Sequence, residues 1–285
     1  MRTSSVTTTG ERFCAPGERP GSPGQGIQIQ VFPSAEAVAQ EAASALLEAC
    51  QAQPRRPLGL ATGRTMAPIY AAFTAMVEAG PSRERDALRN HWRSFNLDEY
   101  VGLGPEEAGS FAAEMRACLG VPLGLSSEHL LLPDGRAADP DAEAQRYAAL
   151  WQGAGGVGLQ VLGLGLNGHV GFNEPPCAPD SRCRCVFLCP STRQANAAAF
   201  DGDPSRVPER AITLGLAEIL QAERILLVVT GAAKAPVLRQ LLQSPPSATL
   251  PASWLHHHPS VRLLADAAAL EGVESLAHSR GPGGR

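Results

Sequence analysis

The chain has 285 residues, of which 44% are hydrophobic and 18% are charged, a composition typical of a globular protein with a sizeable core. Its net charge of −4 and its lack of a basic run argue against nucleic-acid binding, and no apolar run is long enough to span a bilayer. The length fits one large α/β domain or two small ones.

The two ends of the chain differ in composition from the middle. Residues 1–26 are polar, rich in Gly, Pro, Ser and Thr, and lack the apolar stretch of a signal peptide, so we expect a flexible tail. Residues 276–285 are expected to be loose for the same reason. Residues 27–275 are expected to form a single domain. Without a secretion signal, the seven cysteines are expected to be reduced thiols in a cytoplasmic protein.

Apolar periodicity predicts strands and helices that alternate along the middle of the chain. The predicted strands cover residues 27–32, 58–61, 92–97, the start of 161–175, 224–230 and 261–265. The predicted helices cover residues 34–53, 67–79, 110–119, 139–152, 195–200 and 234–243. This α/β alternation, without a long-period repeat, favours a mostly parallel sheet flanked by helices on both faces.

The loop after the second predicted strand has the composition of a phosphate site. It reads Thr62, Gly63, Arg64, Thr65, and a helix follows it directly. Backbone N–H groups and the positive end of the helix would face an anion there, and the threonine hydroxyls can donate as well. The P-loop pattern is absent, so an ordinary strand-to-helix turn is the alternative.

Two adjacent carboxylates, Asp98 and Glu99, follow the third predicted strand. One of them can face a crevice as a base while the other faces a neighbouring segment. A solvated acidic turn is the alternative interpretation of the same pair.

Residues 161–175 read VLGLGLNGHVGFNEP, an apolar strand that breaks into a glycine-rich turn. In α/β sheets the chemistry lies just outside the carboxyl ends of the strands, and a glycine such as Gly165 lets the backbone approach a ligand closely. His169 is a candidate acid/base because imidazole changes charge near neutral pH. Glu174 lies close enough in sequence to hydrogen-bond one ring nitrogen, and Asn167 precedes the histidine. A turn that carries a surface histidine is the alternative.

Lys234 begins the helix that follows the strand over residues 224–230. A cation in that position could reach an anion held in the same crevice. A solvent-facing lysine is the alternative.

We expect no metal site. Four cysteines crowd together, but their C-x5-C-x-C-x3-C spacing lacks the paired ligands of a zinc site; they are Cys177, Cys183, Cys185 and Cys189. The short histidine tract at residues 256–258 is interpreted as the polar end of a loop.

Several stretches together resemble the glucosamine-6-phosphate deaminase (isomerase) family, which shares its fold with 6-phosphogluconolactonase. They occur in the family's order and lie within residues 27–266: LGLATGRT (58–65), FNLDEYVGL (95–103), LGLGLNGHVGFNEP (162–175), STRQAN (191–196), AITLGLAEIL (211–220) and VVTGAAKA (228–235). The resemblance implies a Rossmann-like doubly wound fold. It also implies the conversion of an amino-sugar 6-phosphate to a ketose 6-phosphate with release of ammonia.

The resemblance also implies roles for individual residues. Asp98 matches the base that moves a proton between C2 and C1, His169 the group that opens the pyranose ring, and Glu174 its orienting partner. Asn167 stands where some members have Asp and others Asn. The sugar phosphate would be held by Thr62, Gly63, Thr65 and Lys234. The reaction requires no metal or organic cofactor, and the only partner implied is a small sugar phosphate. A homo-oligomer is left open.

The sequence departs from the family pattern at three positions. Arg64 fills a slot that usually holds a small residue. Ala198 stands where glucosamine-type members carry an arginine that grips the phosphate, and we hypothesise that Arg64 supplies the missing cation. Val186 replaces a lysine of the members that are activated allosterically, which argues against that activation here.

Three alternative functions compete with glucosamine 6-phosphate deamination. The first is the same chemistry on galactosamine 6-phosphate, giving tagatose 6-phosphate, since the lack of an arginine at position 198 fits that branch too. The second is a 6-phosphogluconolactonase-type hydrolase, which lacks the Asn-Glu-Pro after the histidine. The third is a non-enzymatic sugar-phosphate sensor, but residues 1–26 are too short and too rich in Gly and Pro to form a DNA-binding domain.

Overall fold

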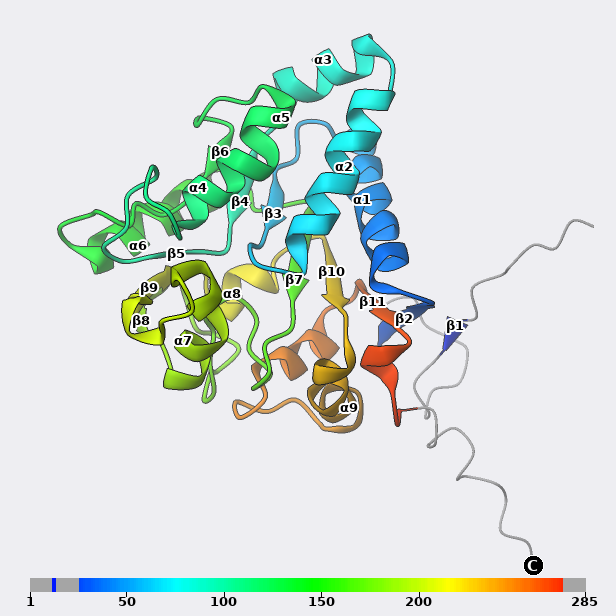
Figure 1. Ribbon diagram of the computed structural model, residues 1–285, viewed down its shortest axis with the longest axis vertical. Helices are drawn as coiled ribbons and strands as arrows, with labels where there is room; N and C mark the ends of the chain where they lie inside the picture. The colour runs from blue at the N-terminus through cyan, green and yellow to red at the C-terminus, as the bar shows by residue number, and fades with distance from the viewer. Residues whose placement is uncertain (1–11, 14–25, 274–285) are drawn as a thin grey trace, which may run out of the picture.

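The computed structural model describes residues 12–13 and 26–273, and within them the chain folds around one large sheet (Figure 1). Eight described strands form this sheet. Seven are parallel, and β1 pairs antiparallel with β2 at one edge. The order is β1 (Arg12–Phe13), β2 (Ile27–Phe32), β11 (Val261–Asp266), β10 (Arg224–Val229), β7 (Leu159–Gly163), β3 (Leu58–Leu60), β4 (Ser94–Asn96) and β6 (Leu130–Leu131).

The order of the strands reverses at the centre of the sheet. From β3 the chain moves outward through β4 to β6, then returns to β7 beside β3 and moves the other way through β10 to β11. The carboxyl ends of β3 and β7 therefore flank a topological switch point, which is where open α/β sheets bind ligands.

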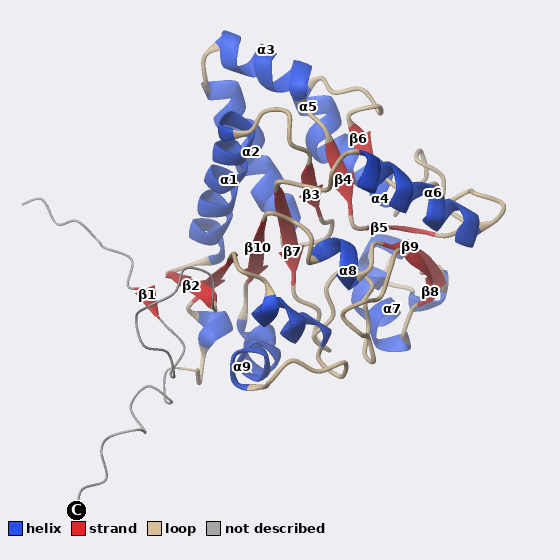
Figure 2. Ribbon diagram, turned by 180° about the vertical axis from the view of Figure 1, so that it is seen from behind, coloured by secondary structure: helices blue, strands red, loops and turns tan. Residues whose placement is uncertain are grey.

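The parallel strands are linked by helices on both faces of the sheet, as the alternation predicts. The amphipathic helices α1 (Ala35–Ala52) and α2 (Met66–Ala79) pack side by side in front of the strands (Figure 1). Figure 2 shows the molecule from behind, with α8 labelled near the strands. The remaining α-helices are α3 (Ser82–His91), α4 (Phe111–Met115), α5 (Val121–Leu123), α6 (Pro140–Gly153), α7 (Pro190–Asn196), α8 (Leu216–Ile219) and α9 (Ala235–Gln243). The short 3₁₀ and π turns are η1 (Arg116–Gly120), η2 (Ala197–Phe200), η3 (Pro204–Arg206), η4 (Ala232–Lys234), η5 (Pro251–His257) and η6 (Ala268–Leu270).

A second, antiparallel sheet was not predicted. It consists of β5 (Asp98–Tyr100), β9 (Arg210–Thr213) and β8 (Arg184–Phe187), and it lies beside the large sheet (Figure 1). Asp98 and Glu99 therefore belong to a strand, with exposed fractions of only 5% and 1%. The interpretation of this pair as a solvated acidic turn is wrong, because pairing with β9 buries both carboxylates.

The other sequence expectations differ from the structure mainly at the ends of elements. Asp139 caps α6 and Pro140 begins it, as expected. The predicted strand over 92–97 is shorter, and the segment 209–220 divides into β9 and α8. The helix α3 was missed because it buries no residue and so lacks an apolar stripe. Apart from residues 12, 13 and 26, the two predicted tails lie outside the described residues.

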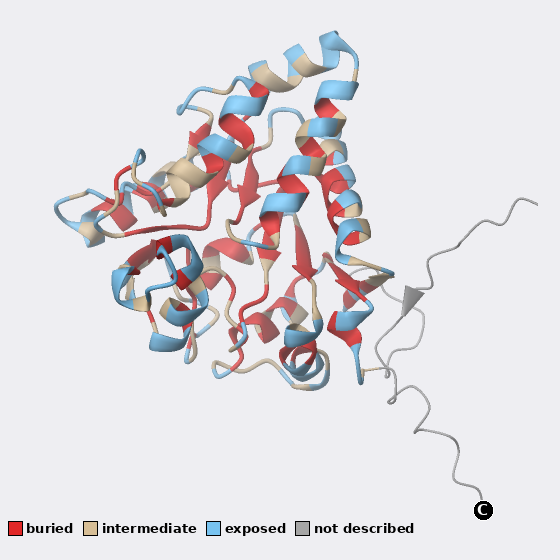
Figure 3. Ribbon diagram, viewed as in Figure 1, coloured by how far each residue is buried: buried red, intermediate tan, exposed pale blue. Residues whose placement is uncertain are grey.

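The core lies between the sheet and its helices. Figure 3 shows buried strands at the centre and helices that are buried on their inner sides only. Fully buried aromatic side chains, including Tyr70, Phe73 and Tyr147, fill the space between α2 or α6 and the strands. The hydroxyl of Tyr70 donates to the carbonyl of Ala61, so burial leaves it satisfied.

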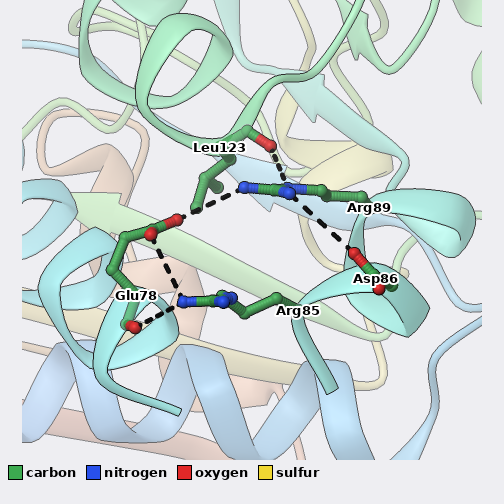
Figure 4. Close-up of polar contacts among 5 residues, drawn as sticks. All are labelled: Glu78, Arg85, Asp86, Arg89 and Leu123. Carbon is green, nitrogen blue, oxygen red and sulfur yellow. Dashed lines mark hydrogen bonds and ion pairs between the residues drawn. The ribbon is translucent and has the colours of Figure 1, made fainter. Parts of the chain in front are cut away.

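Polar contacts attach α3 to the rest of the protein (Figure 4), and its partly buried Leu88 adds an apolar contact with the core. Nε of Arg89 donates to the carbonyl oxygen of Leu123, 2.7 Å away, and its Nη2 lies 3.3 Å from Oε1 of Glu78. Arg85 donates to the backbone carbonyl of Glu78 at 2.7 Å. These arginines therefore connect α3 to the end of α2 and to α5.

We expect Arg89→Ala to lower the free energy of unfolding by about 1 kcal/mol, because it removes a hydrogen bond to a carbonyl and a half-exposed ion pair. Urea unfolding measures the change. The control is Arg83→Ala on the same helix, since Arg83 is exposed and its side chain makes no hydrogen bond or ion pair with a described residue. Equal losses in the two variants would contradict the role given to Arg89.

Candidate active site

The predicted phosphate loop lies at the carboxyl end of β3, beside a cavity of about 330 Å³. Arg64, Thr65 and Lys234 line this cavity, together with apolar side chains of α1 and α2 such as Val38 and Ile69. Thr65 begins α2 without using its hydroxyl as a cap, so that hydroxyl is available to a ligand. The loop thus presents a helix N-terminus, a hydroxyl and one cation to the cavity, and Lys234 adds a second cation from the turn after β10.

Lys234 is held so that it faces both the cavity and the loop that follows β7. Its Nζ donates to the carbonyl of Leu164 at 2.6 Å. Burial lowers the pKa of Lys234, and the nearby charge of Arg64 lowers it further. The two cations are therefore close enough to repel each other, and an anion between them would relieve that repulsion.

Asp266, which sequence reasoning missed, positions the turn that carries Lys234. Both of its carboxylate oxygens accept from the N–H of Gly231 at 3.0 Å, and Oδ1 also accepts from Ala269. Gly231 has a φ of 88°, a conformation that favours glycine. Asp266 follows a predicted strand directly, and this position at a carboxyl end is the sequence feature that could have indicated it.

A second missed residue, Glu114 of α4, contacts the phosphate loop itself. Its Oε1 accepts a hydrogen bond of 2.9 Å from the N–H of Gly63. Gly63, with a φ of 104°, was expected to bind phosphate, but here its N–H already has a partner inside the protein. No local pattern indicates this contact, because the two residues are 51 positions apart.

Asp98 is buried where the large sheet passes into the small one. A Cβ atom on Gly171 would lie 3.4 Å from Oδ2 of Asp98, so the loop after β7 packs directly against this carboxylate. Burial raises the pKa of Asp98 well above its ordinary value, and the charges of Glu99 and Glu114 raise it further. Glu99 itself accepts from the N–H groups of Tyr100, Phe111 and Ala112 and so caps α4.

The ring of His169 is fixed by Asn167 rather than by Glu174. Nδ1 of His169 lies 2.6 Å from Oδ1 of Asn167, which also accepts from the backbone N–H of His169. The amide oxygen requires a proton on Nδ1, which leaves the lone pair on Nε2. Burial lowers the pKa of His169 to about 4. The ring is therefore neutral at pH 7, and its pKa lies below the near-neutral range expected from the sequence.

Glu174 binds the segment that begins α7. Its Oε2 accepts from the N–H of Cys189 at 2.8 Å, and its Oε1 accepts from the hydroxyl of Thr192. Its negative charge raises the pKa of His169 against the effect of burial, so the two residues are electrostatic neighbours. The expected hydrogen bond to the ring is made by Asn167 instead.

The remaining candidates have structural roles or none. The cysteines described at positions 50, 118, 177, 183, 185 and 189 are free thiols. In the histidine tract, His256 and His258 each contact a backbone carbonyl, at 2.8 and 2.7 Å. Within the described part of the chain, no cluster of three potential metal ligands occurs. Residues 12–13 and 26–273 also contain no helix that is long and apolar enough to cross a membrane.

The predicted residues thus gather at one edge of the sheet. The loops after β3, β7 and β10 supply Thr65, His169 and Lys234, and Asp98 follows β4 by two residues. The cavity is the cationic end of this site, and the loop after β7 joins it to the end that carries the carboxylate and the imidazole.

A family model described as glucosamine-6-phosphate isomerases/6-phosphogluconolactonase matches residues 33–264. The chain belongs to this family. A family member from Rhodopirellula baltica named glucosamine-6-phosphate deaminase is 41% identical over 243 residues, which cover 85% of this chain and 94% of the relative. A relative of the same name from Streptomyces coelicolor is 38% identical, over 85% of this chain and 91% of the relative.

Solved structures of the family agree with the fold. A monomeric glucosamine-6-phosphate deaminase superposes with a TM-score of 0.81 at 34% identity, covering 85% of this chain and 98% of that one. The 6-phosphogluconolactonase of Trypanosoma cruzi gives a TM-score of 0.68 at 18% identity, over 88% of this chain and 98% of that one. The second likeness shows a shared fold only.

We expect Gly165→Ala to abolish most activity without unfolding the protein. A Cβ atom there would lie 2.3 Å from Cε1 and Nε2 of His169, so the ring must leave its position. A misplaced catalytic group costs on the order of 10²-fold in rate. Steady-state kinetics measures the loss.

The matched control is Gly153→Ala, because a Cβ on Gly153 meets no atom within 4 Å. Full activity in Gly165→Ala would show that the ring position described here is not the functional one.

Proposed function

We propose that this protein is an amino-sugar-6-phosphate deaminase that converts glucosamine 6-phosphate to fructose 6-phosphate and ammonia. The observation that carries the proposal is the arrangement of the site: the loop after β7 joins a neutral imidazole and a buried carboxylate to a cavity that two cations line. The names of the relatives at 38% and 41% identity support the choice of substrate. The proposed unit is a single domain over residues 27–275, located in the cytoplasm, where its free thiols would stay reduced.

The first step of the proposed reaction is opening of the pyranose ring. A proton must move from the anomeric hydroxyl to the ring oxygen. Nε2 of His169 carries the free lone pair, so it can accept the first proton and return it to the ring oxygen. Asn167 holds Nδ1–H and keeps this tautomer in place. Glu174 supports the protonated ring transiently through its negative charge.

The second step moves a proton from C2 to C1. Asp98 would take the C2 proton of the open-chain aminoaldehyde while O1 gains a proton, giving an enolamine. Asp98 would then return its proton to C1 while the amino group loses one, which replaces the proton that O1 gained. The product is an imine at C2, which water hydrolyses to the ketone and ammonia. Burial makes the ionised Asp98 a stronger base than a solvated aspartate, which suits the removal of a proton from carbon.

The phosphate does not react in this scheme, so its role is to position C1 and C2 over the base. Thr62, Thr65, Arg64 and Lys234 would hold it in the cavity. Ala198 is exposed and offers no charge, so Arg64 is the proposed replacement for the family's arginine. The monomeric relative favours a monomer as the working unit.

The proposed function is tested by measuring ammonia release from the 6-phosphates of glucosamine and galactosamine, with 6-phosphogluconolactone hydrolysis as a third assay. Preferred turnover of the glucosamine compound is expected. Preferred turnover of the galactosamine compound would identify the other epimer, and lactone hydrolysis alone would contradict the deaminase.

We expect Asp98→Asn to remove activity and to stabilise the protein at pH 7. The folded pKa of Asp98 is raised above its unfolded value, so the wild type loses stability as the pH rises through that interval. The amide side chain of the variant does not ionise, so the variant should regain the stability that the wild type loses when Asp98 ionises. Each kcal/mol regained should raise the Tm by roughly 2–4 °C.

Calorimetry at pH 7 and at pH 4 measures the difference, which should shrink at the lower pH. Asp180→Asn is the control, because Asp180 is exposed. A less stable and inactive Asp98→Asn would show that the carboxylate serves the fold.

We expect Arg64→Ala to raise the KM for the phosphosugar by roughly 10–100-fold, the loss of one charge-assisted hydrogen bond, and to leave kcat nearly unchanged. Arg55→Ala is the control, since Arg55 is an exposed arginine that precedes β3 rather than following it. An unaltered KM in Arg64→Ala would refute the replacement of the missing arginine.

A further inference from the structure

We propose that Glu114 is a positioning residue that holds the phosphate loop from behind and carries a negative charge toward Asp98, so that one carboxylate links the two ends of the site. The proposal rests on the proposed function and concerns how the site is built. It starts from the hydrogen bond of 2.9 Å that Oε1 of Glu114 accepts from the N–H of Gly63.

The contact fixes the loop on the side away from the substrate. Arg64, Thr65 and Lys234 line the cavity, whereas Gly63 and Glu114 do not. Gly63 has a φ of 104°, which leaves its N–H turned toward α4. A carboxylate beside a phosphate would repel it, but behind the loop Glu114 can order the backbone while the two cations face the anion.

Glu114 is itself placed by the neighbouring carboxylate. It lies in α4, whose start is capped by the side chain of Glu99 through the N–H groups of Phe111 and Ala112. Ser110 adds a cap to Ala113. The strand that carries Asp98 and Glu99 therefore determines where Glu114 stands relative to the loop.

The charges around Asp98 are all of one sign. Glu99 in the same strand and Glu114 in α4 both act on it, and both raise its pKa. The other titratable groups that interact with Glu114 are neutral at pH 7: Tyr70 of α2, Tyr100 of β5 and Cys118 of η1. The hydroxyl of Tyr147 on α6 also interacts electrostatically with Asp98.

This arrangement has a chemical purpose. The proton on C2 of an aminoaldehyde is only weakly acidic, so a more basic carboxylate removes it more readily. Burial makes Asp98 more basic, and a like charge nearby adds to the effect without touching the substrate. The same side chain therefore anchors the loop that would hold the C6 phosphate and acts through its charge on the base at C2.

Two variants separate the contributions of Glu114. Glu114→Gln keeps an oxygen that accepts from Gly63 but removes the charge. It should leave the KM within about twofold and lower the pKa of Asp98 by about 0.5–1 unit. Glu114→Ala removes both the charge and the oxygen that accepts from Gly63. The phosphate loop then loses its anchor, so the KM should rise as well. Glu128→Gln is the control, since Glu128 is exposed and its side chain makes no hydrogen bond or ion pair with a described residue.

The pKa is measured directly by carbon NMR of carboxyl-labelled aspartate, with the Asp98 signal assigned through Asp98→Asn, and also from the acid limb of kcat/KM. An acid limb that moves to lower pH in Glu114→Gln, together with the NMR titration, supports the proposal. A signal that titrates as in the wild type would overturn it. The NMR result does not require turnover, so a wild type that releases no ammonia would refute the proposed function and leave this test intact.

Discussion

The loop that follows β7 is the constraint on which the rest of the site depends. β7 pairs with β10 on one side and with β3 on the other, so its carboxyl end lies at the switch point of the sheet. Within residues 164–174, the carbonyl of Leu164 accepts from Lys234, and Gly171 packs against Asp98. Gly165 donates its N–H to the carbonyl of His169, closing the turn on which the imidazole sits. Without this loop, the anion end and the base would have no common support.

The electrostatics of the site follow from burial and from the separation of the charges. The carboxylates Asp98 and Glu99 lie at one end, and Glu114 lies between them and the phosphate loop. Burial raises the pKa of Glu99 to about 7 and that of Asp98 above its ordinary range. The cations Arg64 and Lys234 gather at the other end. A substrate with a dianionic phosphate and an acidic C–H bond matches this polarity in one orientation only. The neutral His169 belongs to the loop that joins the two ends.

Much of this could be predicted from the sequence, because it depends on local patterns. Apolar runs followed by Gly, Thr or Lys show where strands end, and the ends of parallel strands meet at one edge. The rest depends on contacts between distant segments. The strand Asp98–Tyr100 exists because it pairs with β9, and Glu114 reaches Gly63 across 51 residues. Asn167 and Glu174 were both within reach of His169, and only the folded loop shows which one binds the ring. The low pKa of His169 reflects tertiary burial, which no spacing reports.

The central claim is that one crevice holds a phosphate at its cationic end and presents C1 and C2 to Asp98 and His169 at the other. The most direct test is a crystal structure with an open-chain amino-alditol 6-phosphate, which resembles the ring-opened substrate but lacks the reactive carbonyl. The account predicts the phosphate in the cavity between residues 62–65 and Lys234, with C2 within contact distance of the Asp98 carboxylate. A phosphate bound elsewhere, or a C2 atom that faces away from Asp98, would contradict it.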